Sequence, residues 1–307
     1  MSSWTTSDFL TDVRRKGRIP SSDPTYTATA LLREADDAIS EWFTEPVFGV
    51  AENYWLKTVN FNITADDSTY RLPSRAVGDT IVLAEYVDAA GTTRELNHYH
   101  INERHLLAEN GGSTPEGIVI EGNEIVSIPT PNATEGTLRL KYAQRRGKFT
   151  PVADAMQITA IAGNVLSGNA PSSWTTSSTV DLIEENPGFD TFDVDRALSA
   201  VSSGVSVTLS VAPPSDLAVG DWVALSWYTP VIQLPLELHS PLSWAVASAV
   251  REQIGDTAAA ERFAQRAAAG VERAKNVMAP RVKGISKKIH NPQSFLRGSR
   301  PWARRWN

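Results

Sequence analysis

Three of the five histidines stand close together in Leu-Asn-His-Tyr-His-Ile-Asn-Glu-Arg-His, where imidazole groups could bind a metal ion. His98 and His100 are two residues apart, so on a strand both rings would point to one face, and His105 follows five residues later. Imidazoles arranged in this way are typical ligands of zinc. No cysteine or carboxylate cluster completes a known zinc pattern, so we favour a polar edge of a β-structure. We predict no metal site and no cofactor.

Three aspartates in Asn-Pro-Gly-Phe-Asp-Thr-Phe-Asp-Val-Asp-Arg-Ala could supply oxygen ligands for calcium. They are Asp190, Asp193 and Asp195, and their spacing lacks both the central glycine and the closing glutamate of a calcium-binding loop. Aspartate is also common in turns, where its carboxylate accepts hydrogen bonds from the backbone. We interpret these residues as caps of a turn.

Motifs for catalysis are missing from the chain. It has no cysteine, which excludes thiolate chemistry, and it has no phosphate-binding glycine loop, no nucleophile elbow and no zinc-protease helix motif. A glycan hydrolase or lyase is an alternative because its carboxylate pair would be assembled only by the fold. The sequence nominates no such pair, so we predict that the protein is not an enzyme.

The strongest chemical signal is a basic, tryptophan-containing C-terminal segment. Residues 278–307 hold eight lysines and arginines and no acidic residue, so the formal charge of −6 divides into −14 on residues 1–277 and +8 on the segment. Its prolines and glycines prevent a continuous helix, and we expect an extended arm when it is free. Arginine and tryptophan together are typical of binding hot spots. We predict a docking arm that uses Phe295, Leu296, Arg297, Arg300, Trp302, Arg304, Arg305 and Trp306.

Two other interpretations of the arm are open. It could bind nucleic acid, with its cations on phosphates and Trp302 or Trp306 stacked on bases. It could also be a solvated segment that only raises solubility or binds polyanions loosely. Exposed tryptophans disfavour the solvated segment, because a large apolar ring is usually buried against a partner.

Helical periodicity marks both ends of the remaining chain. A short amphipathic helix is predicted to begin near Ser7 or Asp8, and a longer one is predicted to be capped by Asp23 or Thr27 and stopped by Pro46. Towards the C-terminus, Ser240 and Pro241 fit an N-cap and first helical position, Gly255 fits a helix end, Asp256 or Thr257 fits the next start and Pro280 fits its end. The apolar faces of these last two helices, the second of them alanine-rich, suit close helix packing, either inside the chain or against another subunit. We assign subunit packing to Leu242, Val246, Val250, Ile254, Phe263, Ala267 and Val271.

Between the helices the period changes to two. Short runs rich in β-branched and aromatic residues, separated by turn signals, predict a first antiparallel β-domain at residues 56–150 and a second at residues 151–231. The predicted fold is α+β. A helical bundle made of residues 1–55 and 232–277 carries the two β-domains as insertions, each a sandwich or barrel, and residues 278–307 extend from it as the arm.

No apolar run is long enough to cross a membrane, and the N-terminal residues lack the apolar stretch of a signal peptide. We therefore expect a soluble protein made for the cytosol, with no membrane partner.

Several stretches taken together resemble the head-to-tail connector, or adaptor, proteins of tailed bacteriophages. They include Tyr-Arg-Leu-Pro-Ser-Arg-Ala at residues 70–76 and Gln-Leu-Pro-Leu-Glu-Leu-His at residues 233–239, and the resemblance covers most of residues 9–290. It implies a structural protein of the virion neck that forms a ring, usually of twelve copies, beneath the portal protein. It further implies that a C-terminal arm docks on the portal, that the ring passes genomic DNA without binding it specifically, and that it carries the next neck or tail protein.

Overall fold

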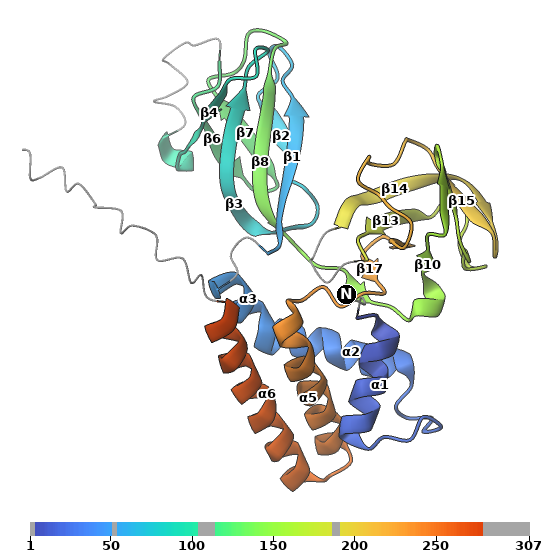
Figure 1. The fold of residues 1–307 in the computed structure, drawn as a ribbon. Helices are drawn as coiled ribbons and strands as arrows, with labels where there is room; N and C mark the ends of the chain where they lie inside the picture. The colour runs from blue at the N-terminus through green and yellow to red at the C-terminus, as the bar shows by residue number, and fades with distance from the viewer. Residues whose placement is uncertain (1–3, 51–53, 104–113, 186–190, 279–307) are drawn as a thin grey trace, which may run out of the picture.

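The computed structural model describes residues 4–50, 54–103, 114–185 and 191–278. Figure 1 shows the helices gathered at one end of the molecule and two groups of strands standing side by side at the other end. The described strands lie in open sheets and are almost all antiparallel. The fold is α+β, as predicted.

Two N-terminal helices begin at capped residues. Helix α1 (Thr6–Gly17) starts with a capping box in which Thr5 and Asp8 bond each other's backbone N–H, and it ends at Arg18 in a left-handed conformation. Helix α2 (Ala28–Ala38) is capped by Thr27, one of the two predicted caps.

The stop predicted at Pro46 is wrong. Helix α2 passes through a π-helical turn, Ile39–Phe43, into α3 (Thr44–Val50), and Pro46 is the third residue of α3. At the π-turn the Thr44 N–H donates to the Ile39 carbonyl, which shifts the hydrogen-bond pattern of the helix just before the proline. The chain therefore continues as a helix with an offset rather than ending.

Helices α5 (Leu236–Gln253) and α6 (Thr257–Met278) form the C-terminal pair. Gly255, at φ +86°, ends the first, and the Asp256 carboxylate caps the second by accepting from the Ala259 N–H, as predicted. The predicted start at Ser240 and Pro241 is wrong, because α5 begins at Leu236 after Pro235. Pro241 therefore lies inside the helix, where its ring packs against α6.

The helices share one hydrophobic core, which draws on both ends of the chain. Phe9 and Val13 of α1, Leu31 of α2, and Leu242 and Val246 of α5 are fully buried in it. An amphipathic helix gains most of its stability from this kind of burial rather than from its own propensity. Helices from both ends of the chain therefore contribute to one core, while the predicted bundle domain stays a prediction.

The first group of strands forms two facing four-stranded sheets. One has the order β1-β8-β3-β4 and the other β2-β7-β6-β5. Alternating residues of both sheets, such as Leu138, Leu140, Ile118 and Ile125, enter one common cluster. The strands and the short 3₁₀ helix are β1 (Leu56–Asn62), β2 (Thr69–Arg71), β3 (Ala76–Val87), β4 (Thr93–Glu95), β5 (Asn97–His98), η2 (Ile101–Glu103), β6 (Gly117–Glu121), β7 (Glu124–Ile128) and β8 (Thr137–Gln144).

The second group of strands has the order β10-β16-β13-β14-β15-β12-β11 and its own hydrophobic cluster. Trp174 is buried in that cluster although it comes from the Ser/Thr-rich loop after β12. The elements are η3 (Val152–Asp154), β10 (Met156–Gln157), β11 (Ala160–Ala162), β12 (Val165–Ser167), β13 (Thr179–Ile183), β14 (Thr191–Ser202), β15 (Ser206–Leu209) and β16 (Trp222–Leu225).

Strand β14 corrects the interpretation of the aspartate-rich stretch as a turn. Asp193 and Asp195 lie within this strand, while Asp190 is outside the described residues. Charged residues at several positions break the alternation of apolar and polar residues, so the sequence pattern does not predict this strand. A bulge also interrupts its pairing with β13. Its length comes from backbone pairing with β13 and β15.

A short parallel ribbon connects the three parts. It consists of β9 (Lys148–Phe149) and β17 (Tyr228–Thr229), which precede and follow the second group of strands in the chain. The backbone N–H of Thr6 donates to the Pro230 carbonyl beside it, at 2.8 Å. The boundaries of the predicted domains, at residues 56, 151 and 232, stay a prediction.

Candidate functional site

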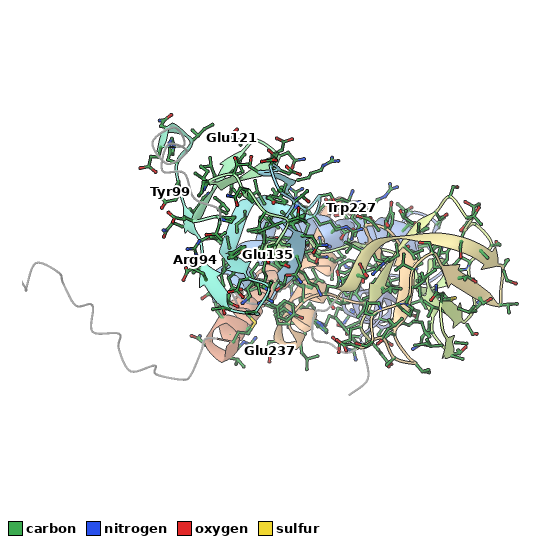
Figure 2. All side chains as sticks on the ribbon, turned by 90° about the horizontal axis from the view of Figure 1, so that it is seen from above. Arg94, Tyr99, Glu121, Glu135, Trp227 and Glu237 are labelled. Carbon is green, nitrogen blue, oxygen red and sulfur yellow. The ribbon has the colours of Figure 1, made fainter. Side chains whose placement is uncertain are left out.

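A buried ion-pair network joins the two groups of strands. Arg75, in the loop before β3, donates to the two carboxylate oxygens of Asp181 on β13, at 2.5 and 2.9 Å, and to Asp195 on β14, at 3.0 Å. Its guanidinium also lies 4.4 Å from the ring centre of Trp227. Figure 2 places Trp227 where the two groups of strands meet. We call these four residues the Arg75 joint.

The polar groups of the Arg75 joint are almost fully satisfied. Arg75 and Asp181 are 2% and 1% exposed, and the Asp181 carboxylate also accepts from the backbone N–H groups of Asp195 and Trp227. Burial raises the pKa of Asp181, and the hydrogen bonds and charge of Arg75 oppose that rise. Bidentate pairing fixes both distance and angle between the partners. The joint therefore favours one orientation of the two groups of strands.

A second joint holds the helices to the ribbon. Arg146 donates to the carboxylate of Asp36 on α2, at 2.5 Å, and to the Asp36 carbonyl, at 3.0 Å. The Phe149 N–H donates to the same carboxylate. Burial raises the pKa of Asp36, against the opposing charge of Arg146. The buried amide of Gln233 accepts from the Gly147 N–H and donates to Thr191, which links the ribbon to β14 as well.

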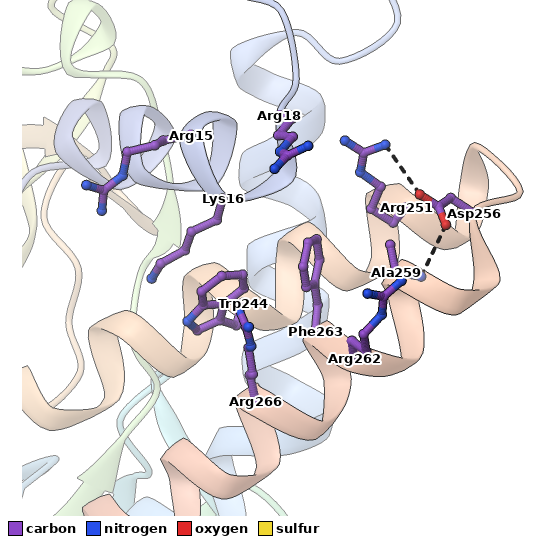
Figure 3. Close-up of a pocket in the computed structure, with 10 residues that line it drawn as sticks. All are labelled: Arg15, Lys16, Arg18, Trp244, Arg251, Asp256, Ala259, Arg262, Phe263 and Arg266. Atoms are coloured by element: carbon purple, nitrogen blue, oxygen red, sulfur yellow. Dashed lines mark hydrogen bonds and ion pairs between the residues drawn. The ribbon is translucent and has the colours of Figure 1, made fainter.

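The helical end carries a cleft of about 620 Å³ between the end of α1 and the α5–α6 hairpin. We call it the basic cleft. Figure 3 shows cationic side chains arranged around the rings of Trp244 and Phe263. Its lining consists of Arg15, Lys16, Arg18, Trp244, Arg251, Asp256, Ala259, Arg262, Phe263 and Arg266.

Trp244 is the centre of the basic cleft. Lys16 Nζ lies 5.0 Å and Arg266 Cζ 4.9 Å from the centre of its ring, and Phe263 packs beside it at 5.0 Å between ring centres. Burial lowers the pKa of Lys16, although its ion pair with Asp12 at 2.6 Å opposes the shift. The arrangement offers a flat aromatic surface framed by cations, which suits a ligand that is anionic and partly apolar.

The residues assigned to subunit packing fall into two groups. Five are buried in the chain's own helical core, namely Leu242, Val246, Val250, Ala267 and Val271. Ile254 is 52% exposed, and Phe263 is half-buried in the wall of the basic cleft. The fold of one chain already accounts for the apolar character of the first group. A contact with another copy through the seven residues stays a prediction.

The other predicted groups are not assembled into a reaction centre. His98 and His100 are exposed, and the described part of the chain contains no cluster of three or more histidines and carboxylates that could hold a metal ion. Asp193 pairs with Arg196 three residues further on. His105, Asp190 and the arm residues Phe295, Leu296, Arg297, Arg300, Trp302, Arg304, Arg305 and Trp306 lie outside the described residues.

Sequence reasoning named Asp195, Asp256 and Phe263 for other roles and missed the remaining residues of both joints and of the basic cleft. One available signal was Asp181, a carboxylate in the apolar run Thr-Val-Asp-Leu-Ile, because a charge inside a buried strand needs a partner. Another was the place of Arg75 and Gln233 in the two short elements that carry the family resemblance. No local pattern indicates which distant residue completes each pair.

Comparison with known proteins gives the family of the chain. The family model described as SU10 adaptor protein matches residues 4–178, more than half of the chain. A search of curated proteins finds no match. None of the helices in the described ranges is long and apolar enough to span a membrane. The matched region contains α1, α2, the first group of strands and the start of the second, so it includes Arg75 and Asp36. The chain therefore belongs to the SU10 adaptor protein family, a family of structural adaptor proteins of bacteriophage virions.

Proposed function

We propose that this protein is the head-to-tail adaptor of a tailed phage and that it forms a ring, of twelve copies, beneath the portal protein. Residues 278–307 form the arm that docks on the portal. The β-rich end offers the attachment surface for the tail or the next neck protein. In this arrangement residues 1–55 and 232–277 form a helical bundle from which the β-domains at 56–150 and 151–231 project.

The observation that carries the proposal is the family match over residues 4–178. The two joints support it. An adaptor transmits position between two assemblies, so its parts must keep a fixed relation to each other. The Arg75 joint connects residues 106 positions apart, and the Arg146–Asp36 pair connects residues 110 positions apart. Both use charge-assisted hydrogen bonds of defined direction, which suit a rigid spacer.

The charge distribution supports passage of DNA without specific binding. Residues 1–277 carry a formal charge of −14. A channel with a negative wall repels phosphates, so the genome is not retained by the wall. We infer that the protein works through its binding surfaces without catalysis, since its family is structural.

Reconstitution with the portal tests the proposal. The full chain and a chain ending at residue 277 are each mixed with the purified portal protein, and the masses of the complexes are measured by light scattering. We expect a ring on the portal with the full chain and loss of portal association with the shortened chain. A full-length chain that never associates with the portal contradicts the proposed function.

A further inference from the structure

The basic cleft holds cations that the described part of the chain does not neutralise. Six cationic side chains line it, against the single carboxylate of Asp256. Arg262 donates to the backbone carbonyl of Ala258, and Arg266 lies on the ring of Trp244. Within the described ranges neither arginine, nor Arg18, forms an ion pair. Clustered like charges repel one another, so an anionic occupant would stabilise this surface.

A row of carboxylates lies on the exposed side of α2, the π-turn and α3. We call Asp37, Glu41 and Glu45 the acidic ridge; Glu34, one turn earlier, is half-buried and accepts a hydrogen bond from Gln253 of α5. Asp37, Glu41 and Glu45 are exposed, and no cation in the described ranges pairs with them. Like charges about one helical turn apart destabilise a helix unless a counter-charge is near. The acidic ridge therefore has the charge opposite to that of the basic cleft, and it is accessible to a binding partner.

The two charged surfaces face away from each other across α5. Leu242 of α5 lies in the core shared with α2, whereas Trp244 lines the basic cleft. At about 100° per residue these two side chains point roughly 200° apart around the helix. The apolar face of α2, with Leu31 and Ala35, is buried in the same core, so the ridge points outward on the far side. One chain cannot bring its own ridge to its own cleft.

We infer that the basic cleft receives the acidic ridge of a second copy of this chain, an inference that rests on the proposed ring. Complementary patches on different faces of one molecule produce head-to-tail contacts, which close into a ring when the rotation between copies allows it. Trp244 and the arginines around it are residue types that dominate binding energy at protein interfaces. The charged contact fixes orientation and register, within a larger interface.

Charge favours a copy of the chain over nucleic acid as the occupant. DNA would have to approach a body of −14, which repels it, to reach one local basic site. The acidic ridge brings carboxylates on a helix of matching scale, and each copy has both surfaces. The cleft is also unsuited to the arm of the same protein, because residues 278–307 carry +8.

Charge reversal on the two surfaces tests the inference, with the mass of the assembly on the portal as the readout. The cleft variant is Arg262→Glu with Arg266→Glu, and the ridge variant is Asp37→Lys with Glu41→Lys. We expect each alone to weaken association between copies by roughly 100-fold or more, because like charges then meet. An equal mixture of the two variants should assemble again in alternation, with one-to-one composition, since each reversed surface finds its complement.

A control matched to the cleft variant makes the same change of net charge away from the cleft. Arg71→Glu with Arg145→Glu reverses two exposed side chains near the first group of strands, and its assembly should match that of the wild type. Circular dichroism and the melting temperature of each variant check folding. The rescue in the mixture excludes misfolding as the reason for lost assembly.

Each remaining outcome has a defined meaning. Wild type that forms no ring with the portal contradicts the proposed function itself. A ring formed equally by wild type and both reversed variants overturns this inference and leaves the proposed function standing. Duplex DNA binding that is lost in the cleft variant, with an unchanged ring, assigns the cleft to phosphate and also overturns it. Assembly weakened by the ridge variant but not by the cleft variant assigns the ridge to a partner other than the cleft, such as the arm, and also overturns the inference.

Discussion

At the scale of single residues, Arg75 has the largest predicted effect on stability. We expect Arg75→Ala to lower the free energy of unfolding by roughly 3–5 kcal/mol, because it leaves the Asp181 carboxylate buried without its cation. Arg75→Lys should recover only part of the loss, since an ammonium group cannot make the bidentate contact. Urea unfolding measures both. The control Arg139→Ala removes a longer, partly exposed pair with Glu85 at 3.7 Å and should cost no more than about 1 kcal/mol. Equal losses for Arg75→Ala and Arg139→Ala would show that the joint is not stabilising.

Lys57 on β1 makes the free energy of unfolding depend on pH. Burial lowers the pKa of Lys57 to about 8, against the charges of Asp193 and Glu184, while an unfolded lysine titrates near 10.5. Between these two pH values the unfolded chain binds more protons, so the free energy of unfolding rises with pH. Below pH 8 the destabilising contribution of Lys57 is fully present.

The variant Lys57→Met removes this titration. Relative to the variant, wild type should gain roughly 1–2 kcal/mol between about pH 8 and pH 10. Denaturant unfolding of both proteins at several pH values measures the difference, and the exposed Lys148→Met controls for the loss of a positive charge. A difference that is constant over this window would mean that Lys57 titrates at its ordinary pKa.

At the scale of elements, the α5–α6 hairpin depends on one close approach. A Cβ atom at Gly270 would lie 2.7 Å from Cγ of Pro241, a rigid ring inside α5. We expect Gly270→Val to lower the free energy of unfolding by roughly 1–3 kcal/mol, because α6 must move away from α5. Replacing glycine by itself favours the helical backbone, so the expected loss must exceed this gain in helix propensity. Thermal unfolding measures it, with Ala268→Val at an exposed position of the same helix as the control. A melting temperature unchanged by Gly270→Val would show that the hairpin tolerates a wider spacing.

At the scale of the whole molecule, the two tryptophans of the arm should decide portal binding. We expect Trp302→Ala with Trp306→Ala to weaken portal association by roughly 30-fold or more, since buried tryptophans dominate hot spots. A contact anchored by apolar rings should survive moderate salt. The matched variant Arg304→Gln with Arg305→Gln should lose less affinity and show a weaker salt dependence. Titration of the portal at low and moderate salt measures both. Association that is unaffected by loss of the tryptophans contradicts the anchoring role.

The order of elements and three of the helix boundaries could be predicted from local patterns. The Thr27 cap, the end at Gly255 and the start after Asp256 each depend on a few neighbouring residues, whose capping chemistry is local. Strand β14 could not be predicted, because its stability comes from pairing with β13 and β15. Strand propensity predicts a strand poorly when neighbouring strands on both sides supply its backbone hydrogen bonds. The helix boundaries predicted at Pro46 and Pro241 were wrong for a similar reason. The destabilisation that a proline causes in a helix depends on its position and its packing.

By itself the sequence determined the α+β class, the helical ends around strand-rich middle parts, and the division of charge at residue 277. Periodicity, caps and composition are properties of neighbouring residues, so a linear pattern contains them. Only the tertiary structure decided that Arg75 meets Asp181 and that five predicted subunit contacts lie in the chain's own core. Such pairings bring together residues more than a hundred positions apart, as when Arg251 donates to the Gly17 carbonyl at the edge of the basic cleft. No spacing along the chain encodes that proximity, because it results from the packing of whole elements.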